Sequence, residues 1–100
     1  MESKLVRDKI PEIIEESNKI PETHIANDQE YSKALLEKLK EESQEFAEEP
    51  NQEELADIYE VIDAIISSKN WSKKDIIKIQ EIKANERGKF EKKIILDKVN

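Results

Sequence analysis

The chain has 100 residues, of which 41% are charged and 36% hydrophobic, so it has room for one domain (residues 1–100) with a thin core. It contains no cysteine and one histidine, which excludes disulfide bonds and zinc–thiolate sites and argues against a histidine-based metal site. The net charge of −7 argues against binding to a nucleic-acid polymer or an anionic membrane. No apolar run reaches the roughly 20 residues that span a bilayer, and no signal peptide is visible, so we expect a cytoplasmic protein.

The composition favours helices, because Ile, Leu, Glu and Lys are abundant while Gly and Pro are rare. A first helix is expected to start between Asp8 and Pro11 and to end near Ser17, since proline is well tolerated in a first turn. Residues 18–28 predict a loop. The spacing of apolar residues then predicts a second helix over residues 29–48.

Capping residues mark the two remaining helices. Asn51 is the expected N-cap of a third helix over residues 52–70. Ser72 is the expected N-cap of a fourth helix, which Gly88 should end. The tail at residues 93–96 is compatible with a short strand or with an arm that binds a partner. We therefore expect an all-α fold of about four helices, with the second and third long and antiparallel.

The third helix is apolar over a wide arc that one neighbouring helix cannot cover. Such a surface usually meets a partner, so we expect at least a homodimer whose shared helical bundle completes the core. The residues of this arc are Leu55, Ile58, Tyr59, Val61, Ile62, Ile65 and Ile66.

Two acidic clusters lie on the second and third predicted helices. Glu42 and Glu45 are three residues apart, as are Glu54 and Asp57, so each pair lies on one helix face about one turn apart. Glu42 interrupts one apolar row, and Glu54 heads another. If the helices pack antiparallel, the four carboxylates can converge. The two rows contain Leu35, Leu39 and Phe46, and Ile58, Val61 and Ile65.

The simpler interpretation is a solvent-exposed acidic face, because 24 of the 100 residues are acidic and such pairs arise by chance. Carboxylates placed within apolar rows favour a site instead, since an unpaired buried charge is costly. Mg²⁺ is a suitable partner: it prefers oxygen ligands and commonly bridges protein carboxylates and substrate phosphates.

A basic segment near the predicted end of the fourth helix contains Lys83, Arg87 and Lys89. Arginine holds phosphate through two hydrogen bonds, and lysine supplies a point charge. The alternative is that these cations only complement the helix dipole.

Four segments together resemble a known group of enzymes. Residues 4–14 (KLVRDKIPEII), 41–45 (EESQE), 54–57 (ELAD) and 87–90 (RGKF) are similar, in this order, to small phosphoribosyl-ATP pyrophosphohydrolase-like proteins. These proteins belong to the MazG-type all-α nucleoside triphosphate pyrophosphohydrolase superfamily. The resemblance extends over nearly the whole chain.

The resemblance implies an all-α, Mg²⁺-dependent hydrolase that cleaves a nucleotide between its α and β phosphates. The metal ligands of the family carry over to Glu42, Glu45, Glu54 and Asp57, and its leading glutamate to Glu41. One departure is the short interval of eight residues between Glu45 and Glu54, which requires a tight turn near Pro50.

The resulting hypothesis is hydrolysis of a nucleoside triphosphate or similar nucleotide to a monophosphate and pyrophosphate, with Mg²⁺ as cofactor and Mn²⁺ able to replace it. Glu41 is the candidate for orienting or deprotonating the attacking water. The rival hypothesis is a non-catalytic helical protein-interaction module. The cations expected to bind the substrate are Arg87, Lys89, Lys83, Arg7 and Lys9.

Overall fold

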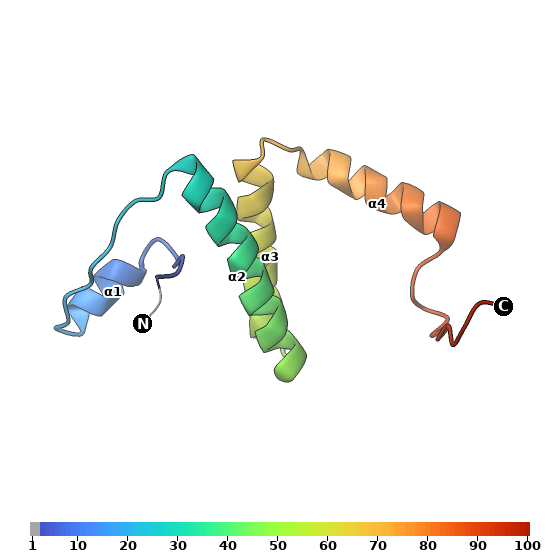
Figure 1. Ribbon diagram of the computed structural model, residues 1–100, viewed down its shortest axis with the longest axis horizontal. Helices are drawn as coiled ribbons and strands as arrows, with labels where there is room; N and C mark the ends of the chain where they lie inside the picture. The colour runs from blue at the N-terminus through green and yellow to red at the C-terminus, as the bar shows by residue number, and fades with distance from the viewer. Residues whose placement is uncertain (1–2) are drawn as a thin grey trace. The chain divides into compact units, whose positions relative to one another are not determined.

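The computed structural model describes residues 3–100 and contains four α-helices and no strand in this range (Figure 1). The all-α prediction is confirmed. Of the two structures considered for the tail at residues 93–96, the strand is contradicted, because this segment has no regular secondary structure. The helices are α1 (Ile10–Glu16), α2 (Asp28–Glu48), α3 (Gln52–Ser68) and α4 (Lys73–Arg87).

Side-chain caps fix the starts of the three longer helices. Asn27 caps α2, which therefore begins one residue earlier than predicted. The Asn51 side chain accepts a hydrogen bond from the backbone N–H of the third residue of α3, and Ser72 does the same for α4. These bonds satisfy N–H groups that lack a partner inside the helix. Gly88 ends α4 as predicted, with a φ of 83° that suits glycine.

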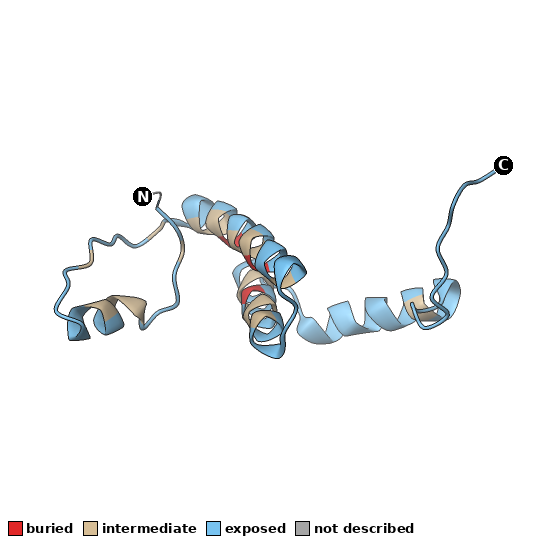
Figure 2. Ribbon diagram, turned by 90° about the horizontal axis from the view of Figure 1, so that it is seen from below, coloured by how far each residue is buried: buried red, intermediate tan, exposed pale blue. Residues whose placement is uncertain are grey.

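Helices α2 and α3 form an antiparallel hairpin, joined by a connection of three residues, Glu49 to Asn51. This pair is the only one in extensive contact within the described residues. Figure 2 shows that the buried residues lie on these two helices. They are Leu35 and Val61, which are 3% and 8% exposed, and Glu42, which is 7% exposed. The core is therefore small, and it includes one carboxylate.

The chain divides into two compact units. The described part of the first unit runs to Lys69 and holds α1 and the hairpin; the second covers Asn70–Asn100 and holds α4. No residue of the second unit is buried, and its apolar side chains, such as Ile79 and Ile95, are exposed. Within residues 3–100, none of the helices combines the length and the apolar character that a membrane span needs. The prediction of a single domain stays a prediction.

Candidate metal centre

Three carboxylates of the hairpin come together. Glu42 of α2 and Glu54 and Asp57 of α3 each offer an oxygen, and these three oxygens lie within 4.8 Å of one another. Glu42 lies in the last third of α2, while Glu54 and Asp57 lie in the first two turns of α3. The tight connection at Pro50 brings these ends of the two helices side by side. The predicted convergence therefore involves three of the four carboxylates.

Local structure explains why Glu54 faces α2. Its backbone N–H donates to the Asn51 side chain at 2.8 Å, so the cap fixes the residue at which the helix begins. Asp57, three residues later, lies on the same face one turn further along. The burial of Val61, four residues after Asp57, keeps this face of α3 against α2.

Two carboxylate oxygens in this cluster have no hydrogen-bond partner within the described residues. They are Oε2 of Glu42 and Oε2 of Glu54, and both are inaccessible to solvent. Buried polar atoms are normally paired, because an unpaired buried acceptor costs about 1–3 kcal/mol, and more when charged. The hairpin thus contains two buried hydrogen-bond acceptors that none of the described donors satisfies.

Electrostatics of the cluster act on Glu42 in particular. Burial raises the pKa of this carboxyl above its ordinary value of 4.5, and the nearby charges of Glu45 and Asp57 raise it further. The Lys38 ammonium lowers the same pKa by charge and by hydrogen bonding, but it does not reverse the shift. The environment of Glu42 in the metal-free protein therefore disfavours the ionised form of this carboxyl.

Three cations surround these acidic groups. Lys38 Nζ lies 3.5 Å from Glu42 Oε1 and 3.6 Å from Glu41 Oε1, and Lys4 Nζ lies 3.9 Å from Glu41 Oε1. Arg7 donates from Nη2 to Asp57 Oδ1 at 2.7 Å. The sequence interpretation assigned no role to Lys38, although its spacing of three and four residues from Glu41 and Glu42 indicates these ion pairs.

Other residues proposed for the site lie outside the three-carboxylate cluster. Glu45 is exposed, although its charge acts on Glu42. Lys9 is exposed at the N-cap position of α1. Lys83 and Arg87 are exposed on α4, and Lys89 follows Gly88; all three belong to the second unit. Their approach to the carboxylates stays a prediction.

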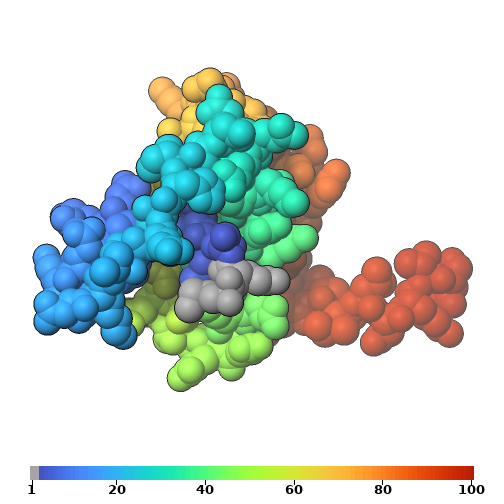
Figure 3. Space-filling view, turned by 60° about the vertical axis from the view of Figure 1, so that its left-hand side comes forward, coloured from blue at the N-terminus to red at the C-terminus, as the bar shows by residue number. Residues whose placement is uncertain are grey.

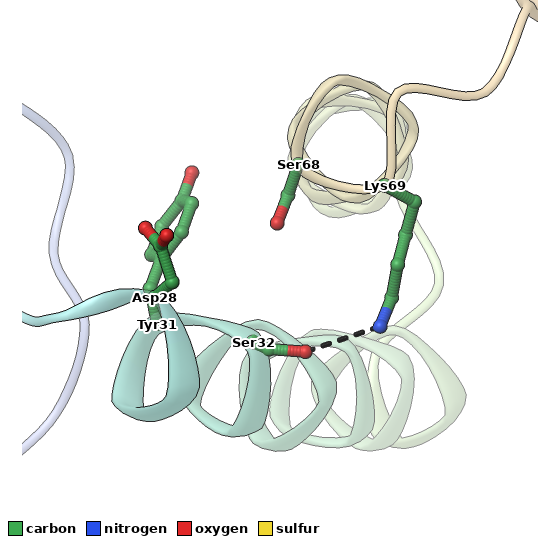
Figure 4. A pocket seen from close by; sticks show the side chains of 5 residues that line it. All are labelled: Asp28, Tyr31, Ser32, Ser68 and Lys69. Carbon is green, nitrogen blue, oxygen red and sulfur yellow. Dashed lines mark hydrogen bonds between the residues drawn. The ribbon is translucent and has the colours of Figure 1, made fainter.

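A separate hollow of about 300 Å³ lies between the start of α2 and the end of α3, at the end of the hairpin away from the carboxylates (Figure 4). Lys69 Nζ donates to Ser32 Oγ at 3.2 Å and so connects the end of α3 to the start of α2. This hydrogen bond joins the two helices at the end of the hairpin opposite the tight turn. The residues lining the hollow are Asp28, Tyr31, Ser32, Ser68 and Lys69.

The donor set suits a hard cation. Mg²⁺ holds oxygen ligands at about 2.0–2.1 Å, so oxygens that would share one ion lie at most about 4.2 Å apart. The three carboxylate oxygens lie within 4.8 Å of one another, which is close to that spacing. Two of these carboxylates also carry the buried oxygens that have no hydrogen-bond partner within residues 3–100. The three residues fit the group that the sequence resemblance implies.

A comparison with models of known protein families finds no match, and neither do comparisons with curated protein sequences and with solved structures. The resemblance to the MazG-type superfamily rests on the four sequence segments and stays a prediction.

Proposed function

We propose that this protein is a Mg²⁺-dependent hydrolase that cleaves a nucleoside triphosphate, or a similar nucleotide, between the α and β phosphates. The products are a nucleoside monophosphate and pyrophosphate. One observation carries the proposal: Glu42, Glu54 and Asp57 converge from two helices, and two of their buried oxygens have no hydrogen-bond partner in the part of the chain that the structure describes. The ordered resemblance to MazG-type pyrophosphohydrolases supports the same activity. We place the protein in the cytoplasm, where nucleotides of this kind are abundant.

The carboxylates of Glu42, Glu54 and Asp57 would hold the metal, with Glu45 one turn along α2 as a fourth candidate ligand. Mg²⁺ held there would polarise a phosphoryl oxygen and lower the pKa of a coordinated water. Phosphoryl transfer depends mainly on positioning and charge neutralisation, so a cluster without a nucleophilic side chain is sufficient for this chemistry.

Glu41 remains our candidate for orienting the attacking water or accepting its proton. It precedes Glu42 and is only partly buried, so water reaches it. Its Oε1 lies near both Lys4 and Lys38, which hold the side chain next to the cluster. Two lysines at 3.9 and 3.6 Å also supply positive charge beside the place where phosphate oxygens would lie.

The remaining cations would neutralise the triphosphate. An arginine binds phosphate oxygens through paired N–H groups, and lysines add charge without fixed geometry. A polyanion needs such a set, because the acidic protein otherwise repels it. The proposed set is Arg87, Lys89, Lys83, Arg7 and Lys9.

The proposal is tested with a panel of standard and modified nucleoside triphosphates at millimolar Mg²⁺, in which pyrophosphate and orthophosphate are measured separately. We expect pyrophosphate and the monophosphate in equal amounts, and no turnover in EDTA. Release of orthophosphate would instead indicate cleavage at the γ phosphate. No turnover of any nucleotide, or turnover that persists in EDTA, would contradict the proposal.

A second candidate function is a helical protein-interaction module. The observation that favours it is the second unit, in which the apolar side chains of Ile77, Ile94 and Leu96 are 45%, 78% and 75% exposed. Exposed apolar side chains that gather in one patch usually mark an interaction site. This module would show no Mg²⁺-dependent stabilisation, whereas a metal that binds only the native state raises the melting temperature.

We further propose a homodimer, which is compatible with either function. Leu55, Tyr59 and Ile62 on α3 are exposed in the single chain, although they belong to the wide apolar arc of this helix. Within the described residues, α2 is the only helix in extensive contact with α3. A second copy of the chain would cover the remaining part of the arc.

A further inference from the structure

Arg7 lies at the centre of a contact that the proposed metal ligation does not explain. It belongs to the N-terminal segment, and its Nη2 donates to Asp57 Oδ1 at 2.7 Å across a separation of 50 residues. Its Nη1 lies 3.9 Å from Glu60 Oε1, one helical turn further along α3. Figure 3 shows the N-terminal segment (dark blue) against the hairpin. One guanidinium thus engages a proposed metal ligand and its neighbour.

The distance of 2.7 Å is that of a charge-assisted hydrogen bond. Asp57 accepts a hydrogen bond from a cationic donor outside the hairpin, while the buried Oε2 atoms of Glu42 and Glu54 have no hydrogen-bond partner among the described residues. Arginine stays protonated at every physiological pH, so this positive charge is permanent. The guanidinium of Arg7 therefore places a single positive charge beside Asp57, one of the three proposed ligands.

A divalent cation on Asp57 would lie within a few ångströms of this guanidinium, and the two positive charges would repel each other. Arg7 can move away, because its side chain is 56% exposed and it lies outside the helices. The nearby Glu60 offers it another carboxylate at the surface. The metal and Arg7 would therefore weaken each other's attraction to Asp57, whose Oδ1 accepts the hydrogen bond from Arg7.

We propose that Arg7 is an internal counter-ion of the acidic cluster, with which a divalent cation competes for the negative charge of Asp57. Arg7 in this way lowers the affinity of the site for the metal, and metal binding makes the guanidinium more available to an anion beside the metal. This inference rests on the proposed function, because it concerns the same three carboxylates.

The test is the affinity for Mn²⁺, measured by isothermal titration without nucleotide, on the full chain. The variant is Arg7→Gln, and the matched control is Lys19→Gln, which removes the same charge from an exposed residue that contacts none of these carboxylates. Since exposed ion pairs are weak, we expect Arg7→Gln to bind Mn²⁺ about 1.5- to 5-fold more tightly than the wild type. Lys19→Gln should match the wild type, and Arg7→Lys should fall between the two. Circular dichroism establishes that each variant retains its helices.

Each outcome is decisive. Tighter binding by Arg7→Gln but not by Lys19→Gln supports the inference. Unchanged or weaker binding by Arg7→Gln overturns it, and the proposed function stands if the wild type binds Mn²⁺ and releases pyrophosphate. Equal tightening in both variants also overturns it, because the effect then arises from net charge. If the wild type binds no Mn²⁺, the inference and the metal-dependent function fail together.

Discussion

Replacement of Glu42 by glutamine should separate stability from metal binding. In the wild type Glu42 is 7% exposed, its Oε2 has no hydrogen-bond partner within residues 3–100, and burial together with Glu45 and Asp57 disfavours its charge. Glutamine keeps the shape and removes the charge. Although the contact with Lys38 at 3.5 Å is weakened, burial is the largest influence on Glu42. We therefore expect the metal-free Glu42→Gln variant to be as stable as the wild type or more stable.

The expected rise in melting temperature on Mg²⁺ binding can be calculated. A ligand at 100 times its dissociation constant stabilises the native state by about 2.7 kcal/mol. In a domain of this size, each kcal/mol moves the melting temperature by roughly 4–8 °C, so saturating Mg²⁺ should raise that of the wild type by about 10–20 °C. Glu42→Gln should show little of this increase, because a neutral amide is a poor ligand for Mg²⁺.

The assay is thermal unfolding followed by circular dichroism, with and without Mg²⁺. Glu37→Gln is the matched control, since Glu37 is an exposed glutamate on the same helix. It should behave like the wild type in both conditions. A lower melting temperature of metal-free Glu42→Gln would show that Glu42 is a stabilising partner of Lys38, and an undiminished Mg²⁺ response would remove Glu42 from the metal site.

Three further predictions concern the titration of Glu42, the role of Arg87 and the dimer interface at Ile62. The pKa of Glu42 is raised in the native state, so the native carboxyl holds its proton above pH 4.5 while the unfolded one loses it. The contribution of Glu42 to the free energy of unfolding should therefore fall as the pH rises from 4.5 through the raised pKa. Urea titrations at several pH values measure it as the difference in the free energy of unfolding between the wild type and Glu42→Gln. A difference that does not change with pH would contradict the prediction. Arg87→Ala should lower kcat/KM by a factor equivalent to about 1.5–3 kcal/mol and leave Mn²⁺ affinity unchanged, whereas an unchanged kcat/KM would remove Arg87 from the site. Light scattering at micromolar concentration should give a dimer for the wild type and a monomer for Ile62→Glu, and a monomeric wild type would refute the proposed interface.

Local signals in the sequence predicted the helices well. Asn51, Ser72 and Gly88 act through their immediate neighbours, so the predicted starts of α3 and α4 and the end of α4 are confirmed. Glu42 was singled out because it interrupts an apolar row, and it is the one buried charged residue within the described part of the chain. Periodicity carries this information, because it fixes which residues share a helix face.

Contacts between distant segments could not be predicted in the same way. The pairing of Arg7 with Asp57 joins residues 50 positions apart, and periodicity says nothing about where an irregular segment lies. Glu45 shares a helix face with Glu42 but is exposed, because burial depends on how α3 packs against that face. The apolar residues of α4 predicted a helix correctly, but their spacing does not predict whether another part of the chain packs against them. In the structure these side chains are exposed.

The central claim is that the carboxylates of the hairpin bind a metal and support hydrolysis between the α and β phosphates. It is tested most directly by the rate of Mg²⁺-dependent pyrophosphate release from the best nucleotide of the panel, for the wild type, Glu54→Gln and Glu53→Gln. Glu53 and Glu54 are adjacent in the first turn of α3, but Glu53 is exposed, while Glu54 contributes to the cluster. We predict that Glu54→Gln abolishes pyrophosphate release and that Glu53→Gln retains the wild-type rate. Equal rates for the two variants would contradict the claim.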